Sequence, residues 1–168
     1  ILEAHGELCT RMMTKWMKRN KIISHDRASN NQRKKVSVGI VSAHIRYHSV
    51  WNAFLKGIVT KLDTKKFELH IFSLSHKKDD QTEIAKQKAN KFHADAGELP
   101  HWAKKIIHCE IDILFFPEIG MDQKTVQLAS MRLAPVQVCS YGHPETSGLP
   151  TMDYYVSSEL LEEENPNA

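Results

Sequence analysis

Two histidines and a glycine-containing loop are the residues of this sequence best suited to chemistry. His44 and His48 stand four positions apart, and His48 comes directly before a stretch with helical spacing. The positive end of a helix favours anions and lowers the pKa of a histidine, so a neutral imidazole at His48 can act as a base near neutral pH. Residues 140–149 (SYGHPETSGL) form a loop whose amides and hydroxyls can approach a sugar or a phosphate.

The same residue types also have plainer interpretations. The chain holds ten histidines, most of which we expect at surface or packing positions, and we assign no role to His25, His70, His76, His93, His101 and His108. Zinc binding by His44 and His48 is disfavoured, because no helix carries the pair and no third ligand lies near them in the sequence. Glu118 follows a predicted strand and is open to two interpretations: a general acid, or a solvated or capping carboxylate.

Short β-branched runs alternate with helical patterns along the chain. The pattern predicts helices at residues 2–19, 50–61, 79–90, 100–109 and 122–131, with Ser49 capping the second. It predicts strands at residues 36–42, 67–74, 111–116 and 135–139, and a short last strand at 154–157. This alternation favours an α/β fold with a Rossmann-like, doubly wound parallel sheet. We expect the strand order second, first, third, fourth.

The predicted sheet has a ligand-binding edge. Open α/β sheets bind ligands beyond the carboxyl ends of their strands, where this chain has loops at residues 43–48, 117–122 and 140–149. The dinucleotide fingerprint GxGxxG is absent, which disfavours binding of NAD. The polar segment 24–35 reads as a linker, so we divide the chain into an N-terminal helix with linker, residues 1–30, and a Rossmann-like half-domain, residues 31–168.

Composition excludes several classes of function. The 168 residues carry a net charge of +3 with acids and lysines interspersed, which disfavours a nucleic-acid partner. No apolar stretch approaches the roughly 20 residues of a membrane span. Cys9, Cys109 and Cys139 have no CxxC spacing, so we expect reduced thiols in a cytoplasmic protein, with neither a disulfide nor a zinc site. Because the sequence starts at Ile1 and stops in a polar run, we treat it as part of a longer protein.

Several segments, in order, resemble the O-GlcNAc transferase family. Residues 132–161 (RLAPVQVCSYGHPETSGLPTMDYYVSSELL) are similar to its proline-containing strand entry, its Gly-x-Pro-Gly-Thr-type loop and its Met-Asp-Tyr strand. VSVGIVSAHIRYHSV resembles the first catalytic strand with its histidine loop, FELHIFSLS the second strand, and IDILFF the strand before the APVQ segment. EAHGELC resembles the His-Gly-x-Leu-Cys stretch that leads from the family's helical repeats into its catalytic core. The resemblance covers nearly the whole chain.

This resemblance implies the first half of the catalytic region of a B-type, two-domain glycosyltransferase, SPINDLY or bacterial O-GlcNAc transferase-like. It implies an inverting transfer from UDP-GlcNAc or UDP-glucose to Ser/Thr side chains of proteins, with no cofactor and no catalytic metal. The implied partners are the UDP-sugar donor, the protein acceptor and a second Rossmann-like half of the same enzyme. Carried over by position, the candidate catalytic residues are His5, His44 and His48, and the candidate substrate-binding residues are Tyr141, Gly142, His143, Pro144 and Thr146.

Three departures from the family pattern leave the acceptor open. Ser49 replaces a proline after His48, the loop reads Gly-His-Pro instead of Gly-Tyr-Pro, and His44 stands where an aspartate is usual. These features are similar to the bacterial adhesin glucosyltransferases, relatives that modify asparagine, whereas residues 148–154 (GLPTMDY) are closer to the bacterial O-GlcNAc-like members. A non-catalytic relative that binds a protein or a nucleotide sugar is the second hypothesis. We expect the isolated chain to be folded but inactive.

Overall fold

A single parallel sheet organises the chain. The computed structural model describes residues 1–23, 34–142 and 147–160. Its six strands lie in the order β3-β2-β1-β4-β5-β6, and every neighbouring pair is parallel. The strands are β1 (Val36–Ser42), β2 (Phe67–Ser73), β3 (Lys91–His93), β4 (Ile113–Phe116), β5 (Val136–Ser140) and β6 (Tyr154–Val156). The Rossmann-like α/β fold, the four main strands, their order and the short last strand are therefore confirmed.

One strand was not predicted. β3 contains three residues, Lys91, Phe92 and His93, which are too few to show an alternating pattern. It exists because its backbone pairs with β2 at the sheet edge, in the register His70↔Lys91 to Phe72↔His93. Pairing of this kind is set by the tertiary structure and leaves little trace in a single sequence.

The helices are α1 (Leu2–Arg19), η1 (Trp51–Leu55), α2 (Lys56–Lys61), α3 (Asp80–Lys88), α4 (Leu99–His108) and α5 (Gln123–Ala129). Asp79 and Asp122 cap α3 and α5 with their carboxylates, as short polar residues do at helix starts. The predicted helix at 50–61 is present, but its first part is the π-helix η1, a wider turn that is frequent at functional sites. Ser49 is itself helical and is not its cap.

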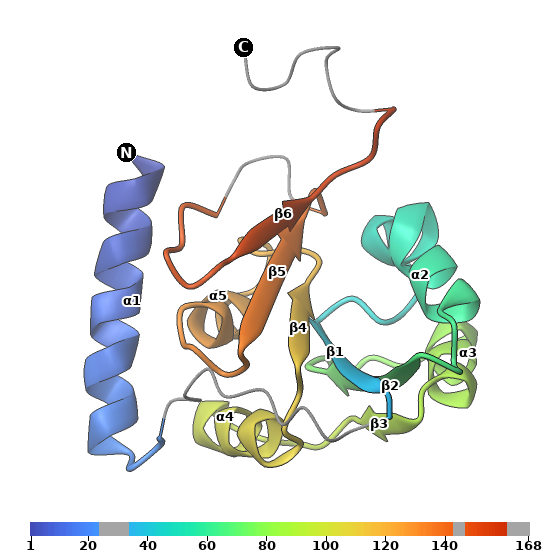
Figure 1. Ribbon diagram of the computed structural model, residues 1–168, viewed down its shortest axis with the longest axis horizontal. Coiled ribbons are helices and arrows are strands. Elements are labelled where there is room, and N and C mark those ends of the chain that lie inside the picture. The colour runs from blue at the N-terminus through green and yellow to red at the C-terminus, as the bar shows by residue number, and fades with distance from the viewer. Residues whose placement is uncertain (24–33, 143–146, 161–168) are drawn as a thin grey trace.

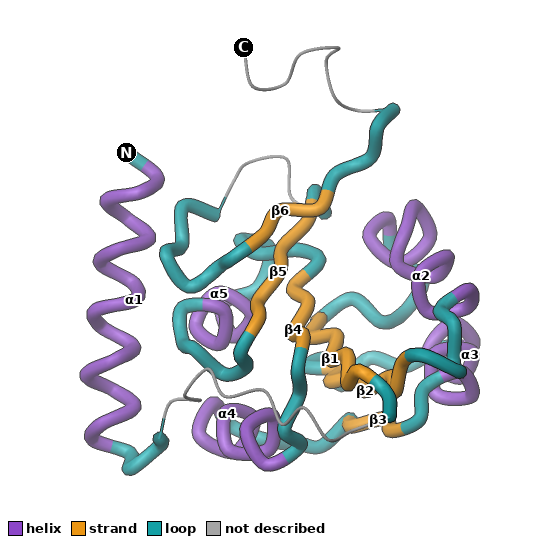
Figure 2. The backbone as a smooth tube through the Cα atoms, in the orientation of Figure 1, coloured by secondary structure: helices purple, strands orange, loops and turns teal. Residues whose placement is uncertain are grey.

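Helices cover both faces of the sheet (Figures 1 and 2). On one face α1, α4 and α5 bury a core that includes Met13, Trp102 and Leu128. On the other, η1, α2 and α3 bury a second core around Trp51. Neighbouring residues of β1 serve opposite sides, because Ile40 belongs to the second core and Val41 to the first. The central strands are thus buried on both faces, as in other parallel sheets.

The first turns of α1 pack against the backbone of the loop that precedes β6. A Cβ atom added to Gly6 would lie 1.9 Å from the carbonyl oxygen of Gly148, and one added to Gly148 would lie 2.4 Å from that of Leu2. Gly148 also has a φ angle of +60°, a conformation that favours glycine. Only glycine at both positions allows this approach of helix and loop.

Candidate functional site

The three predicted loops meet at the carboxyl edge of the sheet. β1 and β4 are neighbours in the sheet. The chain adds β2 and β3 on the β1 side and β5 and β6 on the β4 side, so the strand order reverses between β1 and β4. Folds of this kind bind ligands at such a topological switch point. The loop after β1 contains His44 and His48, the loop after β4 contains Glu118, and the loop after β5 begins with Tyr141 and Gly142. Contacts between these loops define the candidate site.

Glu118 is the buried centre of the site. Its side chain is fully buried, and Oε1 accepts the Ala43 N–H at 2.9 Å and lies 3.4 Å from Nδ1 of His44. Among the described residues Oε2 has no hydrogen-bond partner. A buried carboxylate oxygen left this way is costly, and such a group is typical of functional sites. Of its two interpretations from sequence, the solvated carboxylate is wrong, and only its place after β4 signalled a role.

His44 and His48 lie against each other at this edge. Their ring centroids are 4.0 Å apart with the planes tilted by 40°, and the His44 side chain is 12% exposed. When His44 donates from Nδ1 to Glu118, its Nε2 keeps a lone pair that can accept a proton. A carboxylate that holds an imidazole in one tautomer is the arrangement that orients a histidine base.

In His48 the two ring nitrogens have the opposite hydrogen-bonding roles from those in His44. Its Nδ1 accepts the Val50 N–H at 3.3 Å, so the histidine side chain itself caps the helix that Ser49 was expected to cap. The neutral ring then carries its proton on Nε2, which makes His48 a hydrogen-bond donor. Burial, followed by the charges of His44 and Arg46, lowers the pKa of His48. The direction is the predicted one, but these causes differ from the helix terminus on which the prediction rested. The ring is therefore neutral near pH 7, but its geometry favours donation over proton abstraction.

Tyr141 and Gly142 join the third loop to the other two. The Gly142 N–H donates to the Pro117 carbonyl at 3.0 Å, and a Cβ atom on Gly142 would lie 2.3 Å from that oxygen. The ring of Tyr141 packs on Phe54 of η1 with centroids 4.8 Å apart. Only a glycine permits this contact beside Glu118. The remaining predicted loop residues, His143, Pro144 and Thr146, lie outside the described residues.

His5 stands apart from this cluster. It is exposed on α1, and its side-chain contact within the described ranges is with Cys9, whose Sγ lies 3.6 Å from Nε2. α1 covers the sheet face opposite to η1, the helix that follows His48 (Figure 1). The structure therefore brings together His44, His48, Tyr141 and Gly142, adds Glu118, and leaves His5 outside.

A cavity of about 420 Å³ lies beside α1 rather than at the histidines. Its lining includes Glu3, Glu7, Ser147, Asp153 and Tyr154. Two of these acids belong to α1, and like charges repel a diphosphate. No helix among the described residues is long and apolar enough to cross a membrane.

The chain matches relatives of named activity. It is 29% identical over 139 residues to the probable UDP-N-acetylglucosamine–peptide N-acetylglucosaminyltransferase SPINDLY of Arabidopsis thaliana, covering 77% of this chain and 15% of that protein. It is 35% identical over 81 residues to the UDP-glucose:protein N-beta-glucosyltransferase of Actinobacillus pleuropneumoniae serotype 5b, covering 42% of this chain and 13% of the relative. The chain thus spans about one seventh of the length of these relatives.

A solved structure supports the fold. A mutant of the Thermobaculum terrenum O-GlcNAc transferase superposes with a TM-score of 0.70 at 20% identity, over 87% of this chain and 29% of that one. The model of glycosyl transferase family 41 matches residues 1–163, which is nearly the whole chain. With its Rossmann-like sheet and its histidine cluster at the switch point, the chain belongs to glycosyl transferase family 41.

Proposed function

We propose that the protein carrying this chain transfers a sugar from a UDP-sugar, UDP-GlcNAc or UDP-glucose, to Ser/Thr side chains of proteins. Membership of glycosyl transferase family 41 and the activities of the two named relatives support this proposal. The observation that carries it is the pair formed by His44 and the buried Glu118 at the switch point. A histidine held by a buried carboxylate suits an acceptor hydroxyl that must lose its proton.

In the proposed reaction the acceptor oxygen attacks the anomeric carbon as the bond from that carbon to the diphosphate breaks. The hydroxyl proton passes to Nε2 of His44, and Glu118 holds the charged ring that results. Nε2–H of His48 donates a hydrogen bond to the donor, where negative charge develops on the leaving diphosphate. Attack from the face opposite the leaving group inverts the anomeric centre.

The other predicted residues and the rest of the protein also have roles in the proposed reaction. Tyr141 and Gly142 begin the donor-binding loop, with His143, Pro144 and Thr146 as its continuation. The family resemblance keeps His5 as a proposed sugar contact, although it lies outside the histidine cluster. A second Rossmann-like half of the same protein supplies cations for the diphosphate, and transfer uses neither a cofactor nor a metal at the reacting atoms. A cytoplasmic location is part of the same proposal.

A second candidate function is glucosylation of asparagine. The 35% identity to the Actinobacillus pleuropneumoniae enzyme over 81 residues favours it. An amide nitrogen is a weaker nucleophile than a hydroxyl and needs a different activation, so the two functions separate by acceptor chemistry.

Transfer from radiolabelled UDP-GlcNAc and UDP-glucose to protein acceptors by the full-length protein tests the proposal. Mild alkali releases sugar linked to Ser/Thr by elimination and leaves sugar linked to asparagine in place. We expect alkali-labile label in the wild type, and loss of label in His44→Ala. His76→Ala changes an exposed histidine outside the site and serves as the control. A wild-type protein that binds UDP-sugar without turnover would make the chain part of a non-catalytic relative.

A further inference from the structure

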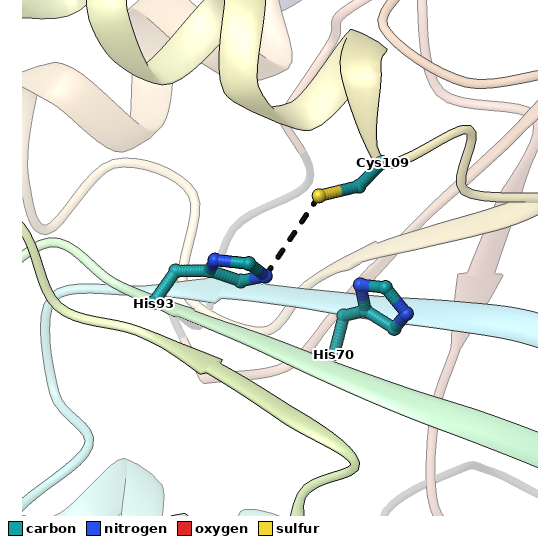
Figure 3. Close-up of side chains that lie close together, drawn as sticks. All are labelled: His70, His93 and Cys109. Atoms are coloured by element: carbon teal, nitrogen blue, oxygen red, sulfur yellow. Dashed lines mark hydrogen bonds between the residues drawn. The ribbon is translucent and has the colours of Figure 1, made fainter.

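Three side chains of the metal-binding type meet away from the histidine cluster, on the sheet face that α4 covers. His70 comes from the middle of β2, His93 ends β3, and Cys109 directly follows α4. One potential ligand atom of each lies within 4.8 Å of the others. Figure 3 shows the two imidazoles and the thiol converging, with Sγ of Cys109 3.8 Å from Nε2 of His93. We infer that His70, His93 and Cys109 bind a divalent ion of the zinc type.

The hydrogen bond of His70 prepares its ring for this role. Nε2 of His70 lies 3.1 Å from Oε1 of Glu68, so its proton is donated there and Nδ1 keeps its lone pair. Nδ1 is the nitrogen on the Cys109 side of the ring in Figure 3. Histidines that bind metals usually donate their second ring N–H to a carboxylate or a carbonyl, which fixes the tautomer and the ring orientation. Glu68 supplies that outer contact.

The sheet holds the His70 and His93 rings in place. His93 pairs with Phe72 across β3 and β2, and the ring of His93 stacks on that of Phe72 with centroids 4.7 Å apart. Zinc binds sulfur at about 2.3 Å and imidazole nitrogen at about 2.0–2.1 Å, so a tetrahedral site needs a sulfur–nitrogen separation of about 3.5 Å. The observed 3.8 Å between Cys109 Sγ and His93 Nε2 requires a small contraction, and the widest separation among the three ligand atoms, up to 4.8 Å, requires a larger one.

The charges around the cluster are compatible with a cation. Of the lysines near it, Lys91 pairs with Glu68 at 3.6 Å and Lys105 pairs with Asp95, while Lys104 lines the adjoining cavity. One thiolate and two imidazoles suit zinc and disfavour magnesium and calcium, which prefer oxygen ligands.

The site also has an entry path and a fourth position. A cavity of about 540 Å³ reaches His93 and Cys109 and is lined further by His101, Lys104, Lys105 and His108. A water molecule in it completes the tetrahedron. The bound ion ties the three-residue edge strand β3 to β2 and to the end of α4, at a place separate from the histidine cluster proposed for sugar transfer. The expectation of no zinc site rested on cysteine spacing, which cannot register ligands from three different elements.

Cobalt(II) provides the test, because it takes zinc sites and its thiolate bond gives a charge-transfer band in the near ultraviolet. The full-length protein is stripped with a chelator and titrated with Co²⁺, then with Zn²⁺ as competitor. We expect an equimolar endpoint, a thiolate band, and its loss when Zn²⁺ displaces Co²⁺. Zn²⁺ should also raise the melting temperature, since a ligand that binds the folded state stabilises it.

Matched variants separate this site from adventitious binding. Cys109→Ser should abolish the thiolate band, while Cys9→Ser, at a thiol that also neighbours a histidine, should keep it. Glu68→Gln should weaken binding by about 10–100-fold without removing the band, as expected of a positioning residue. Circular dichroism of each metal-free variant verifies folding. The absence of a thiolate band in the folded wild type, or an unchanged band in Cys109→Ser, overturns the inference.

Discussion

Nδ1 of His48 accepts the backbone N–H of Val50 at 3.3 Å, and this contact fixes which nitrogen the ring presents to the candidate site. The His48 side chain thus has two roles: it caps a helix and presents a hydrogen-bond donor at the switch point. The cap uses Nδ1 and the donor is Nε2, so substitutions can remove one role and keep the other.

His48→Asn keeps an acceptor at the cap and removes the donor at Nε2. We expect transfer by the full-length protein to fall by about 10²–10³-fold, the usual loss when one positioned donor is removed. Unfolding free energy should stay within about 0.5 kcal/mol of wild type, because asparagine is among the best cap residues. His48→Ala should show the same fall in activity and should in addition lose about 1 kcal/mol of stability. Steady-state kinetics measure the activity of each variant and urea unfolding its stability. Equal stability of the two variants would exclude the capping role.

Glu118→Gln preserves the shape of the side chain and removes its charge. Since the buried carboxylate orients His44 and stabilises the protonated ring, we expect kcat to fall by about 10²–10⁴-fold, the contribution of a general base. KM for the UDP-sugar should change little, because Glu118 is fully buried and does not bind the donor directly. Steady-state kinetics decide the point: a rise in KM with kcat intact would assign Glu118 to donor binding instead.

The lowered pKa of His48 makes stability depend on pH with a definite sign. The unfolded chain takes up the proton first as pH falls, because its histidine has the ordinary pKa of 6.5 and the folded value lies below it. The contribution of His48 is therefore complete above about pH 6.5 and is lost as pH falls through the folded pKa. Urea unfolding between about pH 5 and pH 7 should show a smaller loss of stability in His48→Asn than in wild type.

Gly142→Ala tests the contact between the loops after β4 and β5. The new methyl group would lie 2.3 Å from the Pro117 carbonyl oxygen, so the loops must separate. We expect a loss of about 1–3 kcal/mol in stability, typical of overpacking, together with reduced transfer.

Gly57→Ala is the matched control for this change. Gly57 lies in α2, and a Cβ atom there meets nothing within 4 Å. Alanine should raise stability by up to about 1 kcal/mol through its helix propensity. Opposite signs for the two substitutions in thermal unfolding are the expected result, and a neutral Gly142→Ala would show that the loops do not depend on this contact.

Periodicity and loop chemistry were enough to predict the sheet, its strand order and the edge at which the loops meet. The β-branched run of β1 and the alternation of strands with helices carry that information locally. β3 and the π-turn of η1 escaped prediction, because pairing and packing produce them rather than any local residue pattern. Glu118 was left open for a related reason: its burial depends on Ala43 and His44, about 74 positions away along the chain.

The close backbone contact between Gly6 and Gly148 couples the position of α1 to that of the loop before β6. Backbone meets backbone there, with no side chain between them to deform and absorb a displacement. A shift or rotation of α1 must therefore move residues 147–149, which follow the loop that Tyr141 and Gly142 begin. α1 therefore transmits its own displacement to that loop, and its Leu8 and Met12 side chains are exposed on the surface of the chain.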